Sequence, residues 1–152
     1  MVTEWGARMK AKEYLGNLRA LKTKLDQKKA QLLELAMTRG NIGSFDYSKE
    51  RVQASTDGNQ VENDAIKLLM LESSIKDDII DFEFEKDKII REIHSMKNPE
   101  HITLLFKRYV EFKRFEVIAI EMNFTYQYTR ELHGNALQDF ETTYTNLQNN
   151  VL

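Results

Sequence analysis

The chain has 152 residues, of which 41% are hydrophobic and 30% are charged, and its formal net charge is −2. This length suits one modest domain, or a small domain joined to an elongated one, and no apolar run reaches the roughly 18 residues that a membrane-spanning helix needs. Cysteine is absent, which excludes disulfides, thiolate catalysis and cysteine-ligated zinc fingers and leads us to expect a cytoplasmic protein.

A long amphipathic helix is predicted over residues 7–39. Its apolar positions alternate spacings of four and three with one polar interruption, which is the heptad pattern of a coiled-coil-like seam. The seam consists of Tyr14, Leu18, Leu21, Leu25, Lys28, Leu32 and Leu35. Residues 1–40 hold nine Lys or Arg against four Asp or Glu, a balance of +5. We interpret the basic face of this helix as a solvated face that complements the acidic second helix, with contact to DNA phosphates as the alternative.

A polar loop is predicted over residues 40–60, because Gly40 suits the left-handed residue that follows many helices. A second long helix is then predicted over residues 60–96. Asn59 is expected to be its N-cap, and Glu62, three residues later, completes a capping-box pattern.

Two apolar stripes run along this second helix. The first, which would face the first helix, consists of Val61, Ala65, Leu68, Glu72, Ile75, Ile79, Phe82, Lys86, Ile89, Ile93 and Met96. The second consists of Ile66, Leu69, Ile80, Phe84 and Ile90. Because two stripes require two partners, the second stripe would pack on the C-terminal helices or on another subunit.

Charge favours pairing of the two long helices. Residues 61–97 hold six basic and ten acidic residues, a balance of −4, opposite to that of residues 1–40. Complementary charge of this kind favours partner choice and register. We therefore predict that residues 1–97 form a long antiparallel helical hairpin that supports a homo-oligomer, most simply a dimer.

Residues 98–141 are predicted to form a smaller three-helix domain, followed by a C-terminal tail over residues 142–152, so the expected fold class is all-α. Asn98 is placed to cap a helix that has Pro99 at its first position. Apolar spacing indicates one short helix through Ile102, Leu105, Phe106 and Tyr109. A second helix is expected over Phe115–Met122, and a third is expected to begin near Thr125.

The last two of these helices fit a helix-turn-helix. Asn123 lies where the turn needs a positive φ angle, and Thr125 can cap the helix that follows. In that helix the residues expected to face inward are Thr129, Leu132 and Ala136, while those expected to face outward are Tyr126, Gln127, Arg130, Glu131 and Asn135. The outward set lies near the helix N-terminus, the end that enters a DNA major groove, where we expect Gln127 and Arg130 to read base edges.

The same stretch, RYVEFKRFEVIAIEMNFTYQYTRELHGNAL, resembles region 4 of bacterial sigma factors. It is also similar to the ArpU/RinA-like late-gene transcription regulators of phages of Gram-positive bacteria, which place a Lys-rich helix and a loop like residues 51–55 (RVQAS) ahead of this module. The most specific part is Leu132-His133-Gly134 followed by Ala136-Leu137. This resemblance implies control of phage gene expression in the bacterial host, at its nucleoid, by binding promoter DNA or RNA polymerase.

By similarity to region 4, the recognition positions are Tyr126, Gln127, Tyr128, Arg130 and Glu131. The chain departs from the pattern at Arg114, where a small N-cap residue is usual, at Val117, where an acidic residue is expected, and at Thr129, where a branched aliphatic residue is expected. It also has tyrosines at two recognition positions where basic residues are common. The full expected DNA-binding set is Thr125, Tyr126, Gln127, Tyr128, Arg130, Glu131, Asn135, Lys107, Arg108, Lys113 and Arg114.

Charge sets a condition on this interpretation. Residues 98–152 hold five basic and seven acidic residues, whereas affinity for DNA comes largely from Lys and Arg contacts to phosphates. The basic residues would therefore have to gather on one face, with the acidic residues elsewhere. A protein-interaction module that binds RNA polymerase or another regulator is one alternative, and a small terminase-type adaptor is another.

No enzyme site is indicated. The sequence holds no nucleophile–base constellation and no phosphate-binding glycine loop, and His94, His101 and His133 are too scattered to predict a metal site. The acidic residues between 77 and 87 are interleaved with lysines and are typical of a solvated helix face. We therefore expect a non-enzymatic protein that needs no cofactor.

Overall fold

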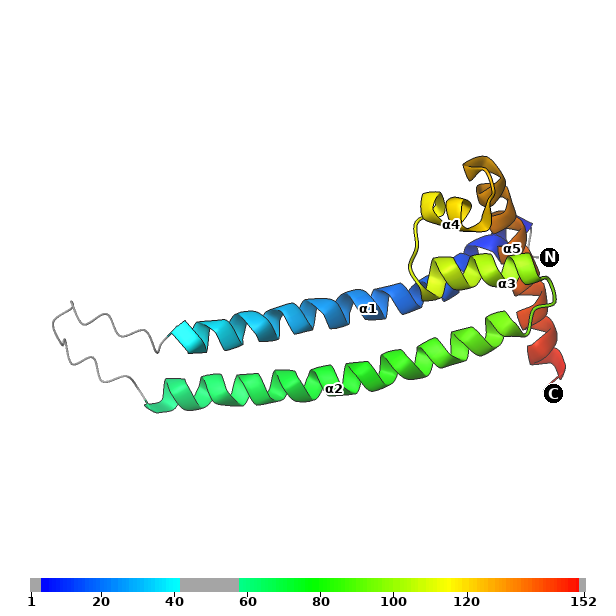
Figure 1. The fold of residues 1–152 in the computed structure, drawn as a ribbon. Coiled ribbons are helices and arrows are strands. Elements are labelled where there is room, and N and C mark those ends of the chain that lie inside the picture. The colour runs from blue at the N-terminus through cyan, green and yellow to red at the C-terminus, as the bar shows by residue number, and fades with distance from the viewer. Residues whose placement is uncertain (1–3, 42–57, 151–152) are drawn as a thin grey trace. The chain divides into compact units, whose positions relative to one another are not determined.

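The computed structural model describes residues 4–41 and 58–150, and these residues are all-helical, with no strand among them. The elements are α1 (Glu4–Asn41), α2 (Gly58–His94), α3 (Pro99–Leu105), α4 (Phe115–Met122) and α5 (Tyr126–Asn150), with a short π-helix, η1 (Phe106–Val110), between α3 and α4 (Figure 1). The predicted all-α class is confirmed. Among the described helices, none is long and apolar enough to cross a membrane.

The two long helices exist as predicted, but their ends differ. Helix α1 continues through Gly40 to Asn41, and α2 begins at Gly58. Asn59 therefore lies inside α2 and is not its N-cap, because a capping residue has non-helical backbone angles. Helix α2 stops at His94, two residues early, where the Ser95 hydroxyl donates to the Glu92 carbonyl at 2.5 Å. Residues 51–55, which carry part of the family resemblance, lie outside the described residues.

The chain divides into two compact units, Lys22–Asp81 and a unit that joins Met1–Leu21 to Phe82–Leu152. In the first of these, Leu25 and Ile75 are buried. Nearby, the Lys28 ammonium donates to the Ser74 hydroxyl at 2.8 Å and lies 2.5 Å from the Asp78 carboxylate. The polar interruption of the α1 seam is thus matched by polar partners on α2.

Burial agrees with the predicted seam on α1 and corrects part of the seam on α2. Every seam residue of α1 is buried or half-buried. On α2, however, Val61, Glu72 and Ile79 are exposed, and Leu71 and Asp78 take the inward places one residue earlier. The physical reason is that this register turns an apolar side chain inward in place of Glu72 and brings Asp78 to the Lys28 ammonium.

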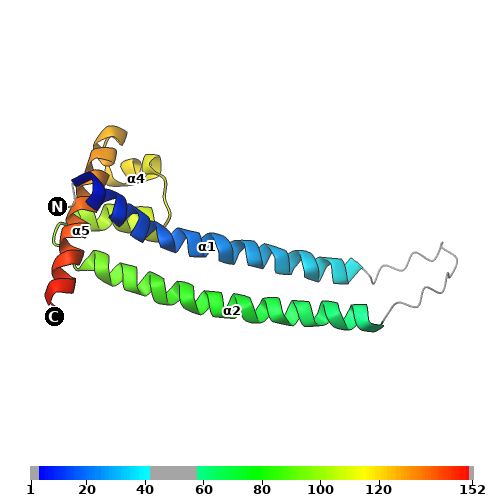
Figure 2. The ribbon, with the colours of Figure 1, turned by 180° about the vertical axis from the view of Figure 1, so that it is seen from behind.

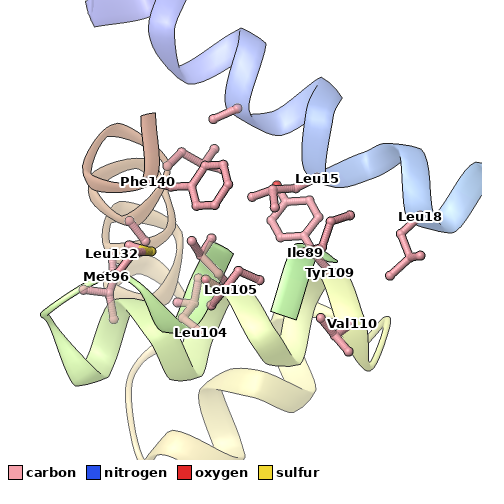
Figure 3. Close-up of a cluster of buried hydrophobic side chains, with 14 of the residues drawn as sticks. Leu15, Leu18, Ile89, Met96, Leu104, Leu105, Tyr109, Val110, Leu132 and Phe140 are labelled. Atoms are coloured by element: carbon pink, nitrogen blue, oxygen red, sulfur yellow. The ribbon is translucent and has the colours of Figure 1, made fainter. Parts of the chain in front are cut away.

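The second unit has one apolar core, to which α1, α2, α3, η1, α4 and α5 all contribute. The two opposite views agree that the start of α1 and helices α3 and α5 lie together in this unit (Figures 1 and 2). The buried side chains, several of which are labelled in Figure 3, are Ala11, Leu15, Leu18, Ile89, Ile93, Met96, Leu104, Leu105, Tyr109, Val110, Ile118, Leu132, Ala136, Leu137 and Phe140.

Helix α5 packs against α1 through three aromatic rings, Tyr14 of α1 and Phe140 and Tyr144 of α5. Tyr14 stacks on Phe140 with ring centroids 6.1 Å apart and lies 5.3 Å from the Tyr144 ring. The Tyr14 hydroxyl donates to the Glu92 carboxylate of α2 at 2.6 Å, and burial together with this carboxylate raises the pKa of Tyr14. Because Tyr144 packs against the core, α5 continues as an ordered helix beyond Phe140 to Asn150.

Phe140→Ala tests the dependence of this core on α5. Phe140 is 1% exposed, so its truncation should lower the free energy of unfolding by about 3–5 kcal/mol. Leu147→Ala, on the same helix but at a position 41% exposed, is the control and should lower it by less than about 1 kcal/mol. Urea unfolding followed by circular dichroism at 222 nm measures both; equal losses would contradict the packing described here.

Candidate nucleic-acid interface

The backbone between α3 and α4 turns back on itself at Phe112. The side chain of Asn98 caps α3 by accepting from the backbone N–H of Glu100 at 3.0 Å, and Pro99 takes the first helical position, as predicted. The helix then widens into η1, which the sequence pattern did not predict. It ends before Phe112, whose φ of 58° is unusual for a residue other than glycine.

The turn between α4 and α5 has the predicted chemistry. Asn123 has φ 58° and ψ 40°, the left-handed conformation that asparagine tolerates better than most residues. The backbone N–H of Phe124 donates to the Ala119 carbonyl at 2.9 Å, which closes the end of α4. The Thr125 hydroxyl then accepts from the backbone N–H of Tyr128 at 3.1 Å and caps α5.

The inward and outward faces of α5 are those predicted. Thr129, Leu132 and Ala136 are buried. The Thr129 hydroxyl donates to the Thr125 carbonyl at 2.9 Å, so threonine at this position leaves no unsatisfied buried hydroxyl. The exposed residues of the first turns of α5 and its cap are Thr125, Tyr126, Gln127, Tyr128, Arg130, Glu131 and Asn135.

Contacts within this exposed face orient its polar side chains. The Arg130 guanidinium donates to the Tyr126 hydroxyl at 3.0 Å and lies over the Phe115 ring, 5.2 Å from its centroid. The Gln127 amide donates to the Glu131 carboxylate at 3.5 Å. Arg130 is therefore held by two aromatic rings, one of them from α4.

The other expected basic residues do not form a patch separate from the acidic ones. Lys107 and Lys113 both bind the Glu121 carboxylate, at 2.7 and 2.8 Å, and Lys113 also pairs with Glu111 at 2.5 Å. Hydrogen bonds to these lysines hold the pKa of Glu121 below its usual value, and the two carboxylates raise the pKa of Lys113. DNA binding by this unit was expected to need its basic residues on a face free of acidic ones, and Lys107 and Lys113 do not meet this condition.

The two arginines in this region differ from each other. Arg114 has a side chain that is 80% exposed and lies 3.7 Å from Glu116. The Arg108 guanidinium donates to the Lys113 carbonyl at 2.9 Å and lies 4.3 Å from the centroid of the Phe115 ring. Phe115 therefore contacts the guanidinium groups of both Arg108 and Arg130 and links α5 to η1.

His133 is a half-buried part of this site whose role the sequence did not indicate. Its Nε2 lies 2.8 Å from the Tyr109 hydroxyl, and its ring contacts Phe115 edge-on with centroids 4.8 Å apart. Burial, together with the positive charges of Arg108, Lys12 and Arg130, lowers the pKa of His133 to about 4. At neutral pH the imidazole is therefore uncharged, and its Nε2 can accept a hydrogen bond from Tyr109, whose own pKa is raised to about 12 by burial.

Comparison of the chain with models of protein families, with curated proteins and with solved structures finds no match. Among the described residues, no group of three or more His, Cys, Asp or Glu side chains is arranged to hold a metal ion. The side chains at the start of α5 instead offer amide, guanidinium and hydroxyl groups beside aromatic rings, which suits recognition of a polar surface.

The pKa of His133 predicts a specific pH dependence of stability. An unfolded chain binds a proton at His133 near pH 6.5, whereas the folded chain does so only near pH 4. The free energy of unfolding should therefore fall between these values as the pH decreases, by on the order of 2–3 kcal/mol. His133→Gln, which keeps an acceptor for Tyr109, should show a shallower fall. Urea unfolding at a series of pH values compares the wild type with His133→Gln; parallel profiles would rule out a neutral, half-buried His133.

Proposed function

We propose that this chain is a transcription regulator of the phage late-gene type, in which α4, the turn at Asn123 and α5 form a sigma-region-4-like helix-turn-helix that binds double-stranded DNA. It acts in the cytoplasm of the bacterial host, at the nucleoid. The observation that carries this proposal is the capped N-terminal end of α5, which presents Gln127 and Arg130 to solvent directly after a tight left-handed turn. Such an end can enter a major groove, with Gln127 suited to adenine and Arg130 to guanine.

The charge balance favours an assembly over a single chain as the DNA-binding unit. Lys107 and Lys113 are already paired with carboxylates, so one copy offers few phosphate contacts, and two copies on adjacent half-sites would double them. A second copy is also supported by the apolar stripe of α2, because Ile66, Leu69, Ile80 and Phe84 are each more than half exposed. We propose that this stripe packs against a second copy, with the two long helices of each copy paired as an antiparallel hairpin.

A second candidate function, binding of RNA polymerase or another regulator, is favoured by one observation. On α4, Ile120 is 77% exposed and Val117 is 42% exposed. Large apolar side chains in this position suit a protein partner better than a phosphate backbone.

Replacing Gln127 and Arg130 together with alanine tests the DNA-binding proposal. Sites selected from a random duplex pool with the full chain should bind the double variant at least about thirtyfold more weakly, since each of the two side chains that read a base contributes about 1–3 kcal/mol. Thr142→Ala/Gln148→Ala, two exposed changes farther along α5, is the control and should bind as the wild type does. Fluorescence anisotropy over a range of salt concentrations measures both, and affinity should decrease steeply as salt rises.

If the wild-type chain has no affinity for any duplex at low salt, the DNA-binding proposal is wrong. In that case the second candidate predicts that RNA polymerase co-purifies with the wild type and is absent with Ile120→Lys. Unchanged recovery of polymerase with Ile120→Lys would exclude that surface as well.

Leu69→Lys/Ile80→Lys tests the proposed assembly. Two lysines in an apolar interface should dissociate a dimer, so light scattering coupled to gel filtration should change from the mass of two chains to that of one. Asp81→Lys makes the same change in charge at an exposed position on a different face of α2 and serves as the control. A wild-type monomer at micromolar concentration would contradict the dimer, and a ring of more copies would favour a terminase-type adaptor.

A further inference from the structure

A cationic pocket lies within the unit that joins the start of α1 to the C-terminal helices. It has a volume of about 200 Å³. Its lining residues are Lys12, Gly16, Arg19, Arg108, Tyr109, Phe112, Phe115 and His133. Three of these side chains are cationic and none is a carboxylate, although the chain as a whole has more acidic than basic residues.

The pKa of His133 is sensitive to the positive charge of this pocket. Two of the pocket residues, Arg108 and Lys12, are among the charges that hold the pKa of its imidazole low, together with Arg130 of α5 and after burial itself. The titratable neighbour on η1, Tyr109, stays neutral because burial raises its pKa to about 12. An anion in the pocket would reverse part of this effect, since a nearby negative charge favours the imidazolium form.

Gly16 keeps the pocket open. Glycine inside a helix is less stable than alanine by roughly 1 kcal/mol, and such a residue is usually explained by a close approach of another chain segment. A Cβ added at Gly16 would meet no atom within 4 Å, so packing does not require glycine here. A larger side chain at this position would instead fill the space of the pocket.

Strain also lies on the pocket wall. Phe112 has a φ of 58°, a left-handed conformation that costs a residue other than glycine about 1–2 kcal/mol. The backbone N–H of Lys113 donates to the Lys107 carbonyl at 3.0 Å across this turn. The unfavourable backbone angle therefore occurs at a residue that lines the pocket together with Tyr109 and Phe115.

We propose that this pocket binds a phosphoryl group, with Lys12, Arg19 and Arg108 as its cationic ligands and the aromatic rings against the organic part that carries it. Guanidinium forks and an ammonium match the oxygens and the double charge of a phosphate monoester. Ligand pockets commonly hold roughly 300–1,000 Å³, so a smaller one suits a compact ligand or only the phosphorylated end of a larger one. The phosphoryl group belongs either to a free small molecule or to a DNA backbone, and the site does not depend on base reading by α5.

Nuclear magnetic resonance of the His133 imidazole tests this proposal on the full chain. Inorganic phosphate and phenyl phosphate are titrated against chloride at equal ionic strength, and the His133 signal is identified by its absence in His133→Gln. We expect saturable shifts and a rise in the pKa of His133 in the wild type. Gly16→Leu fills the pocket, so it should abolish both responses while the chain stays folded. Gly16→Ala is its matched control and should raise the melting temperature and keep the response.

Two charge variants complete the test. Lys12→Gln/Arg19→Gln should weaken phosphate binding at least tenfold, whereas Lys10→Gln, an exposed change on the same helix outside the pocket, should not.

The response of the wild type and the DNA affinity of Gly16→Leu together identify the source of the phosphoryl group. If the wild type responds to free phosphate and Gly16→Leu keeps the DNA affinity of the wild type, the pocket is a small-molecule site, even if α5 binds no DNA. A response only to duplex DNA, abolished together with DNA affinity in Gly16→Leu, identifies a backbone phosphate. If inorganic phosphate, phenyl phosphate and duplex DNA, each titrated in the same way, all fail to shift the His133 signal, or if Gly16→Leu responds to them as the wild type does, the proposal is overturned.

Discussion

Burial of α5 against the start of α1 and against α3 is the interaction on which the C-terminal half of this protein depends. Phe140, Ala136 and Leu132 belong to the same apolar core as buried side chains from the other helices of that unit. The remaining features follow from this contact. It fixes the rotation of α5, and since the opposite face of the same helix carries Gln127 and Arg130, the core decides which side chains meet solvent. It also brings Tyr109 and Phe115 beside His133, so that a histidine with three cationic neighbours remains neutral.

The same packing explains why the candidate interface and the cationic pocket are neighbours. Phe115 contacts the guanidinium of Arg130 on the exposed face of α5 and that of Arg108 at the pocket. A ligand that moved Arg108 would therefore act on a ring that also supports Arg130. This gives a short physical route by which the pocket and the start of α5 can influence each other, through one aromatic ring and two charged groups.

The basic residues of this unit have two different surroundings. Glu121 and Glu111 bind Lys107 and Lys113 and fix the segment between η1 and α4, so these lysines serve local structure. Lys12, Arg19 and Arg108 line a pocket together with the aromatic rings of Tyr109, Phe112 and Phe115. Net charge does not distinguish these roles, because it counts every lysine equally. What matters is which side chains surround each cation, and that depends on how the helices pack.

The sequence by itself determined the all-α class, the two long helices, the Asn98 and Thr125 caps, the left-handed Asn123 and the inward residues of α5, because apolar periodicity and capping chemistry are local properties of the chain. It misplaced the inward register of α2 at Glu72 and Ile79, where the choice depends on an ion pair with Lys28 of α1. It also did not indicate η1, the conformation of Phe112, the half-buried His133 or the pocket around Gly16. Each of these is set by side chains distant in the sequence, Lys12 and Arg108 being nearly a hundred residues apart, and only the tertiary structure brings such residues within a few ångströms of one another.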